Sequence, residues 1–466
     1  MKQSHWIIFF CLGYIISPLF LFGQEKEWSF NLKEAQEYAL TNNHQRKNSL
    51  RDIEIAKERI NEAISSGLPQ VSGAISNQNF LNLATTLIPD FIGPVVFQIN
   101  ENYFGLKPNQ SVPSGNLIAA QFGTKYNASA EVNVNQLIFS GSYIVGLMAS
   151  KAYLKQSVLS DTRTKQDIEE QIALAYYGVL VTQKNLDIFK NTLKNTEKLA
   201  YETEEVYKSG LIEDTDVDQL KLLVEDLKSS VSNTQWQITI AKNNLKLQMG
   251  IPVEDEIELK ESLNDLLEKS NYESLIKNNF QVSSNINFQI IQSQEHLAKL
   301  NLKNEKTSYL PNISAFFNAK TNAMRNEYNF FDNSLPWYPT TVFGFQLNWS
   351  IWTSGQRKSK IDQAKLNLYK LTEQRLEVKE SLDVQFSSLK TSALYNLDIY
   401  KQKKNSRKLA KRIYTKTQEK YKEGVSSSND LLNTYNQYLK SEGDYSIALM
   451  NFLSATTKLQ TILKKE

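Results

Sequence analysis

The feature that most constrains the fold is an internal repeat with an offset of 214 residues. The stretch YKSGLIEDTDV begins at Tyr207, and a similar stretch, YKEGVSSSNDL, begins at Tyr421. Similar sequence at a fixed spacing indicates that one structural unit has been built twice. We therefore expect two repeats of similar structure, at 24–250 and 251–466.

Long segments without proline identify the helical part of each repeat. Proline is absent from 114–251 and from 340–466, and helix interiors exclude this residue. Both segments end in apolar residues spaced seven apart, which is the pattern of a coiled-coil seam. The seam residues are Val217, Val224, Val231, Ile238 and Leu245 in the first copy, and Leu431, Tyr438, Tyr445, Phe452 and Leu459 in the second.

Another helical segment precedes each seam, at roughly 143–209 and 356–423. Either segment would be on the order of 100 Å long as an unbroken helix. We therefore expect two antiparallel helical hairpins, with their tips near 207–217 and 421–431.

Alternating sequence upstream of each long helix predicts strands. In YNASAEVNVNQLIF (126–139) and VFGFQLNWSIW (342–352), apolar residues occupy every second position, as in a strand with one apolar face. Partner strands begin after Leu68 and Leu310. Each repeat is thus expected to contribute a pair of strands.

The remaining segments complete the predicted repeat. Helices at about 32–65 and 272–307 precede the strand pairs, so the order helix, strand, strand, long helix, helix occurs twice. The first strand pair is joined by a proline-rich loop at 81–121, and the second by a shorter loop at 321–341.

The N-terminal segment 1–23 has one positive charge at Lys2, an apolar run and a small residue at Gly23, as secretory signal peptides do. A membrane anchor is the competing interpretation of this segment. Cys11 is the single cysteine of the chain, so the mature protein is expected to contain no disulfide. The net charge is +3, with 53 basic and 50 acidic residues, and no basic block predicts nucleic-acid binding.

Four strands are too few to close a membrane barrel, and an open sheet edge is not tolerated in lipid. Strands with one apolar and one polar face therefore indicate that several chains combine their strands around a wet interior. The alternative is a soluble sheet whose apolar face covers a core.

These patterns together resemble the TolC family of outer-membrane efflux proteins. The resemblance runs from NLKEAQEYALTNN at Asn31 to the last helix and is clearest at the two tips. The first tip carries the GLxxxTDV pattern and the second carries YxxGxxxxxDLLN. The matching residues are Gly210, Leu211, Thr215, Asp216 and Val217, and Tyr421, Gly424, Asp430, Leu431, Leu432 and Asn433.

The resemblance implies a mainly α protein with a transmembrane β portion. Three chains would form a 12-stranded barrel, continued by a helical coiled-coil tunnel through the periplasm. The implied location is the outer membrane of a bacterial cell, in contact with lipid. The implied function is that of an exit duct for efflux or type I secretion. A periplasmic adaptor and an inner-membrane transporter would feed the homotrimer, and the exported substrate stays open.

The resemblance also assigns roles at the tips. Asp430 matches an acidic residue that forms a ring at the pore constriction, and Asn433 stands at a position that is acidic in some relatives. Three carboxylates around one axis would attract cations. The alternative for Asp430 is helix N-capping.

Gate contacts are implied for a second set of residues, Thr215, Asp216, Tyr421 and Ser426. Ser426 replaces the basic residue expected there, so we expect a hydrogen bond between Tyr421 and Asp216 rather than an ionic lock. The alternative for Asp216 is a favourable charge at a helix start.

A third set of residues would shape the tips and meet the adaptor: Gly210, Leu211, Gly424 and Val425. The two glycines are expected to reverse the chain with backbone angles that other residues avoid.

An enzyme is not expected, because the three histidines have no metal-spaced neighbours and no phosphate-binding glycine loop is present. We therefore predict no catalytic residue, cofactor or metal. The main competing function is a secreted or periplasmic coiled-coil scaffold or adhesin without channel activity.

Overall fold

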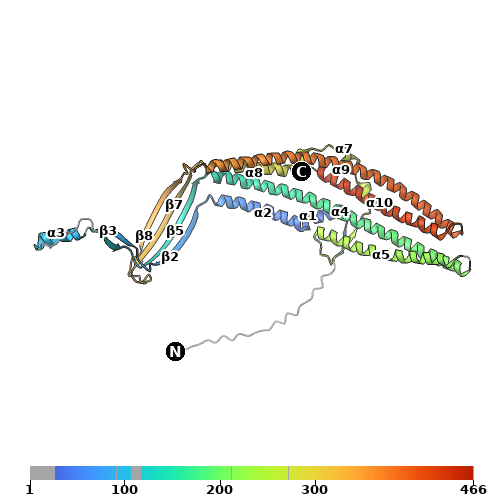
Figure 1. Cartoon of the computed structure of the whole chain (residues 1–466), viewed down its shortest axis with the longest axis horizontal. Helices are drawn as coiled ribbons and strands as arrows, with labels where there is room; N and C mark the ends of the chain where they lie inside the picture. The colour runs from blue at the N-terminus through green and yellow to red at the C-terminus, as the bar shows by residue number, and fades with distance from the viewer. Residues whose placement is uncertain (1–26, 91, 106–116, 211, 271, 465–466) are drawn as a thin grey trace, which may run out of the picture. The chain divides into compact units, whose positions relative to one another are not determined.

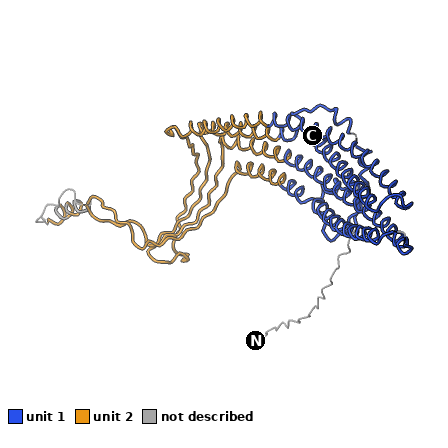
Figure 2. The backbone as a smooth tube through the Cα atoms, turned by 45° about the vertical axis from the view of Figure 1, so that its right-hand side comes forward, with its two compact units in different colours: residues 1–51, 159–289, 378–466 blue, residues 52–158, 290–377 orange. Residues whose placement is uncertain are grey.

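The computed structural model describes residues 27–90, 92–105, 117–210, 212–270 and 272–464. The signal peptide expected at 1–23 lies outside these residues. The chain divides into two compact units, which Figure 2 shows in different colours. One unit comprises 1–51, 159–289 and 378–466, and the other comprises 52–158 and 290–377. Within the described part of the chain, no helix has the length and apolar character needed to cross a membrane.

The unit formed by 52–158 and 290–377 contains a four-stranded antiparallel sheet (Figure 1). Its order is β2-β5-β7-β8. The strands are β2 (Gln70–Asn79), β5 (Tyr126–Phe139), β7 (Asn312–Arg325) and β8 (Tyr338–Asn348). All four predicted strands are present, but β8 ends before Trp349. The central pair is β5 and β7, so each predicted strand pair contributes one edge strand, β2 or β8.

The two faces of this sheet differ in chemistry, as the alternating pattern predicted. Val71, Val134, Phe317 and Phe343 lie opposite one another across the four strands and form part of the apolar face. This face is open in the protomer, where Ile75 is 89% exposed.

The opposite face of the sheet is polar. The Oγ atoms of Ser76 and Ser129 are 2.7 Å apart. The Oε2 atom of Glu131 forms an ion pair with Nζ of Lys320 at 4.0 Å. Asn318 donates a hydrogen bond to Asn133. Each of these pairs links two neighbouring strands through polar side chains, and such cross-strand pairs stabilise a sheet.

The segment 81–121 is more ordered than the predicted loop. It contains β3 (Thr85–Pro89), α3 (Ile92–Phe104) and β4 (Leu117–Gln121), and β3 pairs with β4 in an antiparallel hairpin. The other predicted loop, 321–341, is shorter in the structure, because β7 and β8 extend into it and leave 326–337 as the connection.

Helices precede and follow the strands in both repeats. The helix predicted at 32–65 is divided at Asn43 into two parts. The helix predicted at 272–307 is interrupted at 278–285, which contains a 3₁₀ turn. The elements are α1 (Leu32–Asn42), α2 (His44–Ser65), α7 (Tyr272–Lys277), η1 (Val282–Ser284) and α8 (Ile286–Thr307).

The two helical hairpins are formed as predicted. The first joins α4 (Gly141–Lys208) to α5 (Asp214–Met249), and the second joins α9 (Gln356–Lys422) to α10 (Ser428–Leu463). The long arms contain 68 and 67 residues, and the returning helices contain 36 residues each. The helix α4 passes through Gly178 without a break.

The predicted seams lie largely in the interior. In α5, Val217, Val224 and Leu245 are buried, while Val231 and Ile238 are half-buried. In α10, four of the five seam residues are buried, and Tyr438 is half-buried. The seven-residue spacing therefore identified the packed faces of both returning helices.

The unit formed by 1–51, 159–289 and 378–466 also contains a small parallel sheet that the sequence patterns did not predict. Its strands are β1 (Glu27–Phe30) and β6 (Glu256–Leu259), and α6 (Leu263–Lys269) follows β6. Phe30 and Ile257 from the sheet join an apolar core with helical residues such as Tyr176 and Phe452. The hydroxyl of Tyr176 donates to the carbonyl of Phe30 at 3.0 Å, which satisfies a buried polar group.

Candidate functional site: the tips of the two helical hairpins

The first tip is a short reversal between α4 and α5. Gly210 has φ +75°, in the left-handed region, and its N–H donates to the carbonyl of Tyr207 at 2.8 Å. Leu211, which we expected at the adaptor surface, lies outside the described residues. The first turn of α5 carries Asp214 and Asp216, where negative charge is favourable for the helix dipole.

The second tip closes with a Schellman motif and a capping box. Gly424 has φ +73°, and the N–H of Val425 donates to the carbonyl of Lys420 at 2.9 Å. Ser427 is the N-cap of α10 and exchanges hydrogen bonds with Asp430. The two glycines therefore have the backbone angles expected of them, and both tips reverse the chain in few residues.

Polar contacts join the two tips within one protomer. The Ser428 hydroxyl donates to the carboxylate of Asp216, and its Oγ lies 3.0 Å from the side-chain Oε1 of Gln219. Since one hydroxyl has one proton, the Gln219 amide fits this contact best when turned to donate from its nitrogen. Lys422 forms an ion pair with Glu202 at 3.0 Å.

Tyr421 is placed at the same junction but bonds differently from our expectation. Burial raises the pKa of the Tyr421 hydroxyl, a hydrogen bond with Thr203 opposes that rise, and the charge of Asp216 adds to it. We expected Tyr421 to bond to Asp216, whereas its hydroxyl forms a hydrogen bond with Thr203, and Asp216 accepts one from Ser428. The reason is geometric, because Ser428 begins α10 directly beside the first turn of α5.

An apolar cluster lies under these polar contacts. It comprises Leu199, Ala200, Leu220, Val224 and Leu431, with Leu193, Tyr414 and Tyr421 packed against it. The cluster draws residues from both hairpins, so the tips of one protomer adhere through apolar packing as well as hydrogen bonds. Both kinds of contact must be lost if the two tips separate.

Asp430 lies at the third position of α10, where its carboxylate takes part in the capping box of Ser427. This contact is close to the capping role named as the alternative for Asp430, and its role in the pore stays a prediction. Asp430 accepts hydrogen bonds from the Ser427 hydroxyl at 2.8 Å and from Ser426 at 3.4 Å. These bonds, with the Ser427 N–H, lower the pKa of Asp430. Asp430 and Asn433 are both exposed, and residues three apart share one helix face.

Two further predicted residues have local roles. The hydroxyl of Thr215 donates to the carboxylate of Glu213 at 3.3 Å, within the same tip. Val425 is 72% exposed at the second tip, in keeping with a surface for a partner. Sequence reasoning missed Ser428, Glu202 and Thr203. Only Ser428 could have been found from the sequence. It stands three residues before the seam residue Leu431, and residues three apart share one helix face.

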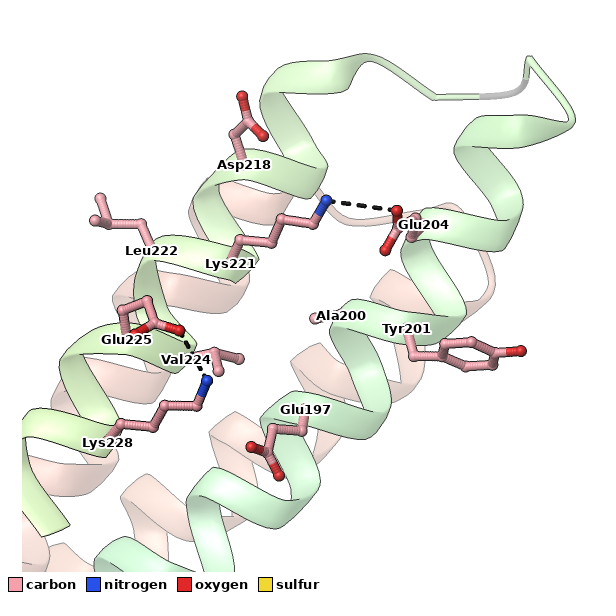
Figure 3. Close-up of a pocket in the computed structure, with 10 residues that line it drawn as sticks. All are labelled: Glu197, Ala200, Tyr201, Glu204, Asp218, Lys221, Leu222, Val224, Glu225 and Lys228. Carbon is pink, nitrogen blue, oxygen red and sulfur yellow. Dashed lines mark hydrogen bonds and ion pairs between the residues drawn. The ribbon is translucent and has the colours of Figure 1, made fainter.

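A groove between α4 and α5 lies beside the first tip (Figure 3). Its volume is about 730 Å³, and sequence reasoning did not anticipate it. Lys221 pairs with Glu204 at 3.5 Å across the groove. The lining residues are Glu197, Ala200, Tyr201, Glu204, Asp218, Lys221, Leu222, Val224, Glu225 and Lys228.

Among the residues that the structure describes, His, Cys, Asp and Glu side chains form no group of three that could hold a metal ion.

The glycine at the second tip permits a direct test of the backbone argument. A Cβ at Gly424 or at Gly443 would meet no atom within 4 Å. A clash with neighbouring atoms is therefore expected at neither site, and the two sites differ in their backbone angles. Gly424→Ala places a side chain in the left-handed region and is expected to destabilise the tip by about 1–2 kcal/mol.

Gly443→Ala is the matched control, because Gly443 lies inside α10 and alanine favours a helix by about 1 kcal/mol. Trypsin cleavage at Lys420 and Lys422 measures local opening of the tip. Faster cleavage is expected for Gly424→Ala only. Equal cleavage rates in the two variants would show that the left-handed angle does not limit the tip.

No protein-family model and no curated protein match the chain. Solved structures do match. The outer membrane protein VceC of Vibrio cholerae is 13% identical with a TM-score of 0.67, and the match covers 93% of this chain and 96% of VceC.

Two other structures agree. The CmeC outer membrane channel of Campylobacter jejuni is 15% identical with a TM-score of 0.66, over 93% of this chain and 85% of CmeC. The MtrE outer membrane channel of Neisseria gonorrhoeae, solved in its open state, is 15% identical with a TM-score of 0.68. The match covers 93% of this chain and 88% of MtrE. This chain therefore has the fold of the outer-membrane channel proteins, as its resemblance to the TolC family predicted.

Proposed function

We propose that this protein is the outer-membrane exit duct of a tripartite efflux or type I secretion system. The observation that carries the proposal is the exposed apolar face of the β2-β5-β7-β8 sheet, on a chain with an outer-membrane channel fold. The face is suited to lipid, and the opposite polar face is suited to water.

The proposed assembly is a homotrimer. The edge strands β2 and β8 have no partner on their outer sides among the described strands. Pairing β8 of one copy with β2 of the next would satisfy both edges and close a barrel of 12 strands. Each protomer would contribute the two repeats 24–250 and 251–466, and their hairpins would continue the barrel as a tunnel.

The proposed location is the outer membrane of a bacterial cell, with the helical hairpins in the periplasm. Substrates would enter from a periplasmic adaptor fed by an inner-membrane transporter. The tips and the charged groove at α4 and α5 are the proposed adaptor surface, since they combine exposed apolar side chains, Leu222 and Val425, with charged ones.

The test uses the protein extracted from outer membranes in detergent. We expect light scattering to give a trimer mass after correction for detergent, and planar bilayers to give discrete conductance steps. A water-soluble rod that needs no detergent and gives no conductance would instead support the scaffold or adhesin alternative.

A further inference from the structure

The helix α3 presents an uncovered apolar face. Val95, Ile99 and Tyr103 are spaced four residues apart, so they lie on one side of the helix. They are 53%, 46% and 83% exposed, and Val96 beside them is 49% exposed. Gln98 lies about 100° away around the helix from Ile99. We call Val95, Val96, Ile99 and Tyr103 the α3 stripe.

The segment 80–125, which carries α3 and which we call the insertion, also exposes apolar surface on its β3–β4 hairpin. Among the described strands, β3 and β4 pair only with each other, and Leu87 and Leu117 on them are 62% and 59% exposed. A two-stranded hairpin and a 13-residue helix are each marginally stable alone in water. The insertion therefore needs a cover from outside its own protomer.

We propose that the α3 stripes of three copies pack against one another on the threefold axis and cap the outward opening of the channel. This inference rests on the homotrimer proposed above. An apolar stripe about 100° wide along one side of a helix is the pattern by which a helix packs against neighbouring helices in a small bundle. Because rotational symmetry brings identical faces together, each stripe is covered by its copies.

The chain topology places the insertion at the correct end of the sheet. Asn79 at the end of β2 pairs with Tyr126 at the start of β5, and the insertion joins these two residues. The other end of β5 leads into α4. The insertion thus leaves the sheet at the end opposite to the one where β5 leads into α4, and this end is the outward one in the proposed channel.

The length of the hairpin is sufficient to reach the axis. Twelve strands about 4.8 Å apart and tilted by about 40° form a barrel wall roughly 12 Å from its axis. The β3–β4 ladder has five residues in each strand, which at about 3.3 Å per residue span roughly 16 Å. Each α3 can therefore reach its symmetry copies.

Charge favours another copy over lipid as the cover. The outer surface of a lipid bilayer with anionic headgroups is bound through clusters of Lys and Arg. The connection 80–125 contains two basic residues, Lys107 and Lys125, and two acidic residues, Asp90 and Glu101. This balance provides no net attraction to an anionic surface and no repulsion among three copies.

Cysteine crosslinking tests the proposal, because Cys11 in the predicted signal peptide is the single native cysteine. Ile99→Cys lies in the α3 stripe, and Gln98→Cys, one residue away and also exposed, is the matched control. Isolated outer membranes are oxidised with copper phenanthroline and analysed on denaturing gels without reductant. We expect disulfide-linked dimers of Ile99→Cys in at least about fivefold excess over Gln98→Cys, since disulfides need Cα atoms within about 7 Å.

A trimer that forms normally but gives equally little crosslinking in both variants would overturn the cap and leave the exit duct intact. Failure to form a trimer would instead overturn the proposed function. Modification by a membrane-impermeant maleimide gives a second readout on intact cells. Slower labelling of Ile99→Cys than of Gln98→Cys supports the cap. Equal labelling overturns it, as does crosslinking of Ile99→Cys to a different protein.

Discussion

Asp216→Ala is expected to shift the equilibrium between joined and separated tips toward separation by roughly tenfold to 150-fold. The Ser428 hydroxyl is buried and donates to the Asp216 carboxylate across the two hairpins. A hydrogen bond to a charged group contributes about 1.5–3 kcal/mol, which corresponds to that range of equilibrium constants. The measurement is single-channel conductance in planar bilayers, where longer or more frequent openings are expected.

The matched control is Asp218→Ala, which removes the same group from an exposed position two residues along α5 (Figure 3). It should leave the conductance close to that of the unmodified channel. Ser428→Ala and the double variant complete a mutant cycle. If the effects of Asp216→Ala and Ser428→Ala simply add, the two residues are not coupled and the predicted contact does not hold the tips.

Asp430→Ala is expected to lower cation over anion selectivity on the order of tenfold, the lower end of electrostatic focusing in a narrow opening. Three exposed carboxylates of a trimer would provide that focusing at the constriction. Reversal potentials in a salt gradient measure the selectivity. Asn433 stays in place, so the loss reports on Asp430 alone.

The capping role of Asp430 has to be separated from its charge. Asp430→Asn retains a side-chain oxygen for Ser427 but removes the charge, whereas Ser427→Ala removes the capping partner and retains the charge. Selectivity should fall in Asp430→Asn and persist in Ser427→Ala. The reverse result would identify Asp430 as a capping residue without a role in the pore.

The pH dependence of this selectivity follows from the direction of the pKa shift. Hydrogen bonds from Ser427 and then Ser426 lower the folded pKa of Asp430 below its ordinary value of 3.8. A carboxylate with a lowered pKa stays ionised until the pH falls through that lower value. Cation selectivity should therefore be unchanged between pH 7 and about pH 5, where ordinary carboxylates also remain ionised. A loss of cation selectivity already above about pH 5 would show that the carboxylates repel one another in the ring.

The repeat, the strands and the hairpins could be predicted from the sequence because each depends on a local period. Spacing of seven identified Leu431 and Val217 as interior residues, and spacing of two identified the faces of β5. These patterns extend over many residues, so single exceptions such as Gly178 do not hide them.

The contacts between the tips could not be predicted in the same way. Ser428 and Asp216 are 212 residues apart in sequence, and their pairing depends on how two helix starts are placed in space. The hairpin β3–β4 and the helix α3 were missed because short elements flanked by proline have weak local patterns. Likewise, β1 and β6 are four-residue strands whose parallel pairing joins distant parts of the chain.

The near-equal lengths of the two hairpins restrict how such a chain can change during evolution. The long arms differ by one residue and the returning helices are equal, and one residue adds about 1.5 Å to a helix. Inserting seven residues into each arm of one hairpin would carry its tip about 10 Å past the other and separate Ser428 from Asp216. Tunnels of this kind should therefore lengthen or shorten by paired insertions or deletions, one in each repeat and in multiples that preserve the seam.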